Sequence, residues 1–140
     1  MIEVVVEKLV YGGKGLARHN GLTIFIPGVM PGEGVAVEIK KKRKGFAEAE
    51  LIDVINSSSD RITPPCKGEE ECTGASWPFI SYKAQLRFKE EILIETLSKI
   101  GDIEPKNVLP IIPSPDKEHY RLRGQFNVRY KDSRPMIGFF

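Results

Sequence analysis

The chain has 140 residues, of which 41% are hydrophobic and 29% are charged, so it can form a packed core and is not a disordered chain. The net charge of +2 is too small to indicate nucleic-acid binding by itself, and no run approaches the ~18 apolar residues of a membrane span. The N-terminus has no apolar stretch typical of a signal peptide, and two cysteines are too few for a secreted disulfide framework. We therefore expect a cytoplasmic location and no membrane partner.

Five short stretches with β-branched or alternating apolar residues are predicted to be strands in the first 56 residues. They cover residues 2–10, 16–19, 22–27, 34–40 and 46–55. Asn20-Gly21, between the second and third stretches, is a strong hairpin signal because both positions of a type I′ turn need positive φ. Short strands at this spacing predict a small closed OB-like β-barrel, a fold that removes edge strands and binds oligonucleotides.

The nearly balanced total charge hides an uneven distribution. Residues 1–56 carry 8 basic and 7 acidic side chains, residues 57–116 carry 7 and 10, and residues 117–140 carry 6 and 2. Five consecutive cations precede Gly45 in an expected tight connection between strands: Lys40, Lys41, Lys42, Arg43 and Lys44. Gathered cations can bind phosphate even when the total is balanced, and the alternative is a solvated charged turn.

Three motifs in this region carry a resemblance to a known family. They are residues 8–18, which contain Gly12-Gly13-Lys14-Gly15, then Phe25-Ile26-Pro27-Gly28, then Pro31-Gly32-Glu33. In this order they resemble a TRAM domain, an RNA-binding β-barrel found on enzymes that modify tRNA and rRNA. The resemblance covers residues 1–56 and implies an RNA-binding barrel, to which Lys14, Arg18 and the cations at 40–44 contribute positive charge.

Cys66 and Cys72 lie six residues apart after the polar linker Ser57-Ser58-Ser59, where we place the start of a second domain at residues 57–140. A structural zinc or an iron–sulfur cluster needs about four protein ligands, and nothing places His19 or His119 nearby. The residues alone therefore favour no metal, and they leave two free thiols or a reducible pair.

The resemblance continues into S-adenosylmethionine-dependent RNA uracil-5-methyltransferases that carry a TRAM domain. In that family an Arg-x-x-Pro-x-Cys motif and later cysteines hold a 4Fe-4S cluster. Here Arg61, Pro64, Cys66 and Cys72 match the motif, but the third cysteine position is Ala75, which cannot ligate iron. The resemblance implies S-adenosylmethionine and the cluster as family cofactors, and we expect neither to be held by this chain.

Residues 81–101 predict one long amphipathic helix, with Ser81 as the N-cap and Gly101 just past its end. Apolar residues at helical spacing form the face that we expect to pack: Tyr82, Leu86, Ile92, Leu93, Leu97 and Ile100. We expect a packing helix without chemistry.

Two further strands are predicted, over residues 107–113 and 120–130. In the second, Arg121, Arg123 and Arg129 share one face, and guanidinium groups suit phosphates and base edges. The alternative is an ordinary solvent face. Residues 85–89, 114–115, 120–123 and 137–139 extend the family resemblance across the whole chain and imply a central domain that helps to hold RNA.

The sequence thus predicts a mainly β protein, with a five-stranded OB-like barrel at residues 1–56 and an α+β domain at 57–140. The resemblance implies an RNA-binding portion of an RNA uracil-5-methyltransferase that positions rRNA or tRNA. In that family a cysteine thiolate attacks uracil, but Cys66 and Cys72 match cluster positions, so we expect no catalytic residue and no catalysis by these 140 residues alone. Two alternatives stay open: a standalone RNA-binding or chaperone-like protein, and one subunit of a methyltransferase whose catalytic half is a separate chain.

Overall fold

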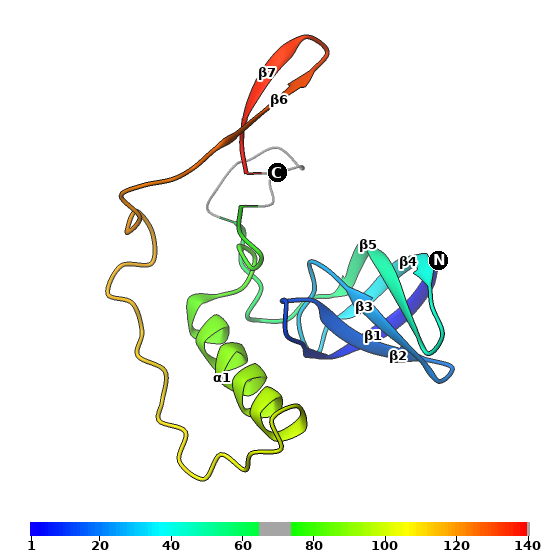
Figure 1. The fold of residues 1–140 in the computed structure, drawn as a ribbon. Helices are drawn as coiled ribbons and strands as arrows, with labels where there is room; N and C mark the ends of the chain where they lie inside the picture. Colours follow the sequence, from blue (N-terminus) through cyan, green and yellow to red (C-terminus); the bar gives the residue numbers. More distant parts are fainter. Residues whose placement is uncertain (65–73, 140) are drawn as a thin grey trace.

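A computed structural model of the chain describes residues 1–64 and 74–139, which form a small barrel, a helix and a hairpin (Figure 1). The elements are β1 (Ile2–Leu9), β2 (Gly15–His19), β3 (Leu22–Ile26), β4 (Gly34–Lys42), β5 (Phe46–Asn56), α1 (Tyr82–Lys99), β6 (Asn127–Lys131) and β7 (Arg134–Gly138). The predicted mainly β chain with a five-stranded barrel and one long helix is confirmed. No helix in the described residues is long and apolar enough to cross a membrane.

The barrel closes in the order β1-β2-β3-β5-β4, with β4 returning to pair with β1. Its strand pairs are antiparallel except β3 and β5, which run parallel. Alternation along the strands sends one set of side chains inward, and these form the barrel core together with Val29 from the turn between β3 and β4: Val4, Val6, Ala17, Ile24, Ile26, Val35, Val37 and Ala49. The turn between β2 and β3 has positive φ at Asn20 (50°) and Gly21 (76°), as predicted for a type I′ hairpin.

Helix α1 begins where the sequence predicts, but it buries a different face. The Ser81 hydroxyl accepts a hydrogen bond from the Ala84 N–H and caps the first turn. The buried residues of the helix are Ala84 and Phe88, whereas Leu93 is 50% exposed and Ile100 is 80% exposed. The predicted packing face is therefore wrong for Leu93 and Ile100, whereas Ile92 of that face does pack against the buried cluster that contains Ala84 and Phe88.

A second buried cluster joins the helix to the barrel. It consists of Leu9, Met30, Phe79, Ile80, Ala84 and Phe88, with Trp77 and Ile92 packed against it. Leu9 ends β1 and Met30 lies in the turn before β4, so both barrel residues point toward the helix rather than into the barrel core. The Trp77 and Phe88 rings meet edge to face, 6.5 Å apart at their centroids.

The C-terminal part contains one hairpin and a long irregular connection, which Figure 1 shows in yellow and orange. Residues 107–113 are not a strand: Pro110 and Pro113 have no N–H to donate, and no described segment pairs with them. The predicted strand at 120–130 begins only at Asn127, because its partner β7 ends at Gly138, which lies opposite Asn127. Asp132 and Ser133, both with positive φ, form the turn of this hairpin.

Candidate nucleic-acid interface

The glycine-rich turn between β1 and β2 is held in place by the region before the helix. Gly12 and Gly13 have φ of 89° and 83°, and the Trp77 indole Nε1 donates to the Gly13 carbonyl at 2.9 Å. A Cβ on Gly13 would lie 2.9 Å from that indole nitrogen, so the close approach requires glycine. The turn carries Lys14, whose Nζ lies 3.1 Å from the Glu48 carboxylate on β5.

Strand β4 runs through Lys42, so only Arg43 and Lys44 of the basic stretch at 40–44 lie in the connection before β5. The prediction of a tight connection is wrong for Lys41 and Lys42, because the long partner strand β5 supplies pairing up to Ala47, which lies opposite Lys42. A register shift between Ile39 and Lys41 then sets Lys41 opposite Glu48. The side chains of the stretch are exposed and extend from one end of the barrel.

The cations of the basic stretch at 40–44 differ in whether they form salt bridges with carboxylates of the chain. Lys40 forms salt bridges with Glu38 (2.5 Å) and Glu50 (3.0 Å), and hydrogen bonds to these two carboxylates raise the pKa of Lys40. Within residues 1–64 and 74–139, no salt bridge involves Lys41, Lys42, Arg43 or Lys44. These four cations are therefore better placed than Lys40 to contact phosphate.

Arg18 lies on the outer side of β2, where its Nη1 is 2.5 Å from the Glu7 carboxylate on β1. In the strand register it lies opposite Thr23 on β3, which in turn lies opposite Phe46 on β5. Arg18 is exposed on the barrel, and an exposed ion pair with Glu7 already engages it.

The arginines near the C-terminus do not form the predicted row. Arg129 lies on β6, whereas Arg121 and Arg123 lie in the irregular segment before it. All three are exposed, and Figure 1 shows the β6–β7 hairpin, which carries Arg129, apart from the barrel. The structure thus places Lys14, Lys41 and Arg43 near Glu48 on the barrel, whereas the three arginines lie on β6 and in the segment before it.

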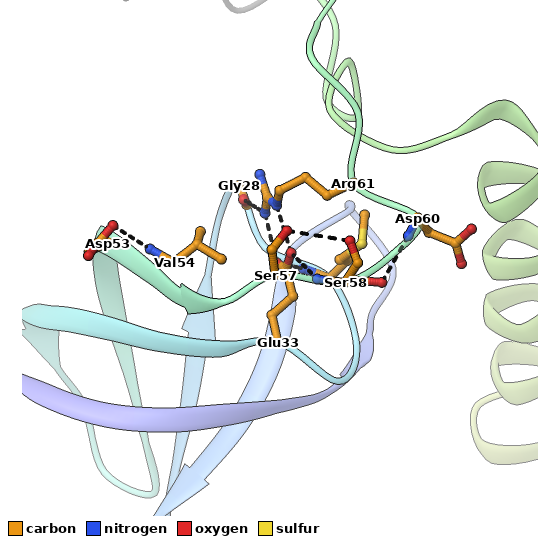
Figure 2. A network of polar contacts seen from close by, with 9 residues as sticks. Gly28, Glu33, Asp53, Val54, Ser57, Ser58, Asp60 and Arg61 are labelled. Atoms are coloured by element: carbon orange, nitrogen blue, oxygen red, sulfur yellow. Dashed lines mark hydrogen bonds and ion pairs between the residues drawn. The ribbon is translucent and has the colours of Figure 1, made fainter.

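A buried ion pair joins the barrel to the segment that leads to the helix (Figure 2). Glu33 is fully buried, and each of its carboxylate oxygens accepts one bond from the Arg61 guanidinium, at 2.6 and 2.7 Å. The backbone N–H groups of Ser58 (3.3 Å) and Met30 (3.0 Å) each donate to one of the same two oxygens. Burial alone would raise the pKa of Glu33, but these bonds and the Arg61 charge outweigh it and lower the pKa.

Arg61 also makes contacts beyond its ion pair with Glu33. Its Nη2 also donates to the Gly28 carbonyl at 2.9 Å, and its guanidinium carbon lies 4.5 Å from the centroid of the Phe79 ring. Around it the Ile62 N–H donates to the Phe79 carbonyl and the Ser81 N–H donates to the Asp60 carbonyl. This pair, which sequence reasoning missed, gives a structural role to the Pro-Gly-Glu motif and to the arginine of the Arg-x-x-Pro-x-Cys motif.

Cys66 and Cys72 lie outside the described residues. Ala75, at the third position of the cysteine pattern, offers no ligand atom for iron. Within the described part of the chain, no three His, Cys, Asp or Glu side chains converge to hold a metal ion. The described residues therefore supply no ligand set for a cluster, and no chemistry is assigned to one.

Comparison with known proteins matches residues 1–52 to the TRAM domain. An uncharacterized RNA methyltransferase of Nitratidesulfovibrio vulgaris is 38% identical over 136 residues, which cover 97% of this chain and 29% of that protein. An uncharacterized RNA methyltransferase of Bdellovibrio bacteriovorus is 37% identical, with 99% and 34% covered. The 23S rRNA (uracil(1939)-C(5))-methyltransferase RlmD of Francisella tularensis subsp. novicida is 35% identical, with 99% and 32% covered. The chain thus spans about a third of the length of these curated relatives.

Proposed function

We propose that this chain, which carries a TRAM domain at residues 1–52 and whose homologues are RNA methyltransferases, is the RNA-binding part of an enzyme that methylates uracil C5 in ribosomal RNA. The observation that carries the proposal is the similarity to a 23S rRNA (uracil(1939)-C(5))-methyltransferase along 99% of the chain. We also propose a cytoplasmic location, which the low cysteine count supports.

The proposed role of these residues is to hold and position RNA. The exposed cations on the barrel support it, since Lys41 and Lys42 at the end of β4 and Arg43 and Lys44 just after it form no salt bridge within the described residues. Cations on one surface neutralise phosphates and position a strand without reading its sequence. Arg121, Arg123 and Arg129 form a second proposed contact, separate from the first.

Methyl transfer is proposed to need residues beyond these 140, in the same polypeptide or in a separate catalytic chain. The only two cysteines, Cys66 and Cys72, match cluster positions in the family resemblance and not its nucleophile. S-adenosylmethionine would supply the methyl group in the complete enzyme, and we assign none of the described residues to it.

The test combines binding with methyl transfer, using the 140-residue chain. Fluorescence anisotropy should show saturable binding of a labelled single strand of 23S rRNA sequence, weaker binding of the matching duplex, and loss of binding as salt is raised. Radioactive S-adenosylmethionine should transfer no label to the same RNA. Absence of binding at low salt would refute the RNA-binding role. Incorporation of label by this chain alone would refute the proposal that methyl transfer needs residues beyond these 140.

A further inference from the structure

Two phenylalanines lie side by side on the outside of the barrel. Phe25 is on β3 and Phe46 is on β5, and these strands pair in parallel with Thr23 opposite Phe46 and Glu48 opposite Phe25. Ile24 and Ala47, next to them in sequence, are fully buried inside the barrel, so the two phenylalanines face outward. Their rings meet edge to face, with centroids 5.8 Å apart and planes at 70°.

The barrel core does not account for this pair. Neither phenylalanine belongs to the barrel core or to the cluster under the helix. Phe46 is 37% exposed and Phe25 is half-buried. The neighbouring outward positions on the same two strands are polar, as expected for a solvent face: Thr23, Glu48 and Glu50. An aromatic pair at such positions presents apolar surface to whatever contacts the barrel there.

Three cations lie near the aromatic pair along the paired strands. The backbone N–H of Arg43 donates to the Phe46 carbonyl at 2.8 Å, so these two residues are backbone partners where β4 meets β5. Lys41 lies opposite Glu48, and the Lys14 Nζ lies 3.1 Å from the same carboxylate. A hydrogen bond from Lys14, followed by the charges of Lys14, Lys41 and Arg43, lowers the pKa of Glu48. Three cations around one carboxylate leave the surface positive.

Aromatic side chains inside a positive surface are the features with which proteins bind single-stranded nucleic acid. Any base can stack on an aromatic ring, while nearby cations neutralise the phosphates on either side. A duplex keeps its bases stacked on one another and cannot offer a free base face. The cations therefore favour a polyanion, and the aromatic rings favour one whose bases are unpaired.

We propose that Phe25 and Phe46 form the platform on which an unpaired base of single-stranded RNA stacks, while Lys14, Lys41 and Arg43 contact the phosphates beside that base. This inference rests on the proposed RNA-binding function and names the part of the RNA that the barrel recognises. The platform gives affinity without choosing a sequence, because all four bases have a π face.

The experiment uses the 140-residue chain and a single-stranded RNA that contains the fluorescent base 2-aminopurine. The parent should quench this fluorescence on binding. The double variant Phe25→Leu/Phe46→Leu, which keeps apolar side chains of similar bulk, should abolish the quenching. It should also bind the strand between about five- and one-hundredfold more weakly. Its salt dependence should equal that of the parent, because the phosphate contacts are retained.

A matched control is Ile52→Ala, which removes an exposed apolar side chain from the same strand β5, away from the pair (Ile52 is 51% exposed). It should leave affinity and quenching unchanged. If the double variant does not fold by circular dichroism, Phe46→Leu alone carries the test, since this ring is the more exposed one.

The outcomes separate this inference from the proposed function. Binding and quenching by the leucine variant equal to those of the parent would overturn the stacking platform and leave RNA binding standing. Failure of the parent to bind any RNA at low salt would overturn both. Equal loss with Ile52→Ala would also overturn the platform, because the effect would then not belong to the aromatic pair.

Discussion

Changing Glu33 to glutamine should destabilise the chain strongly, although the two side chains have nearly the same shape. Each carboxylate oxygen of Glu33 accepts one bond from Arg61 and one from a backbone N–H. A glutamine amide has one oxygen and one NH₂ group, so the NH₂ must face one guanidinium nitrogen and one backbone N–H. The variant therefore loses two bonds, and it leaves one guanidinium donor, one backbone donor and the new NH₂ group without acceptors.

The size of the loss follows from these contacts. A hydrogen bond to a charged group contributes about 1.5–3 kcal/mol and a neutral one about 0.5–1.5 kcal/mol. Breaking a fully buried ion pair costs about 3–5 kcal/mol. The Arg61 side chain is 21% exposed, so water recovers part of its solvation, and we expect Glu33→Gln to cost about 3 kcal/mol.

The pH dependence gives a second readout of the same pair. Because the pKa of Glu33 is lower in the folded chain than its ordinary value of 4.5, its contribution is fully present above that pH and is lost as the pH falls below it. The difference in unfolding free energy between the parent and Glu33→Gln should therefore be constant near neutral pH and shrink in acid.

Urea denaturation followed by circular dichroism measures both effects, with Glu38→Gln as the control. Glu38 is also paired with a cation on the barrel, but it is exposed, and exposed pairs contribute little. The reasoning is refuted if Glu33→Gln unfolds at the same urea concentration as the parent. A gap that does not narrow in acid would refute the assignment of the effect to the carboxylate charge.

Two further predictions concern how the helix and the linker are tied to the barrel. Phe88→Ala should lower the free energy of unfolding by about 3 kcal/mol, whereas Leu93→Ala should change it by less than about 0.5 kcal/mol. The reason is burial, since the Phe88 side chain is 5% exposed and the Leu93 side chain is 50% exposed. Equal effects of the two variants in urea denaturation would contradict the observed helix face. A fragment of residues 1–64 should show a β-type circular dichroism spectrum. It should also unfold at a higher urea concentration than a fragment of residues 1–56, because only the longer fragment contains Arg61 to pair with Glu33. Equal urea midpoints for the two fragments, or a helical or unfolded spectrum of the longer one, would contradict this.

The barrel could be predicted from the sequence because its signals are local. Alternation marks the strands, and Asn20-Gly21 fixes the β2–β3 turn through two positive φ angles. The Ser81 cap is local as well, since it lies three residues from its partner Ala84. Each of these signals can be recognised within a few residues of chain.

The packing of the helix could not be predicted in this way. Apolar residues occur on more than one of its faces, and Leu9 and Met30 of the barrel decide that Ala84 and Phe88 are buried. The C-terminal strand at 120–130 was predicted too long for a related reason. Alternation alone does not supply a partner, and β7 pairs only back to Asn127.

The candidate site was predicted in part. The cations at 14, 18 and 40–44 stand out as charges, and the structure places them on the barrel. Glu33 and Arg61 are 28 residues apart, so no local pattern reveals their pairing. Phe25 and Phe46 could have been recognised from the sequence, because the alternation of each strand puts them at outward positions, next to the inward-facing Ile24, Ile26 and Ala47.

The salt dependence of RNA binding tests the central claim most directly. The parent is compared with a variant in which Lys41, Lys42, Arg43 and Lys44 are all changed to glutamine, while the already paired Lys40 is kept. Each phosphate contact to a single strand contributes about 0.7 to the slope of log affinity against log salt. We predict a slope shallower by about 1.4 or more in the variant, from at least two lost contacts at about 0.7 each. Identical slopes for the two proteins would show that the exposed cations at 41–44 do not touch RNA and would contradict the account.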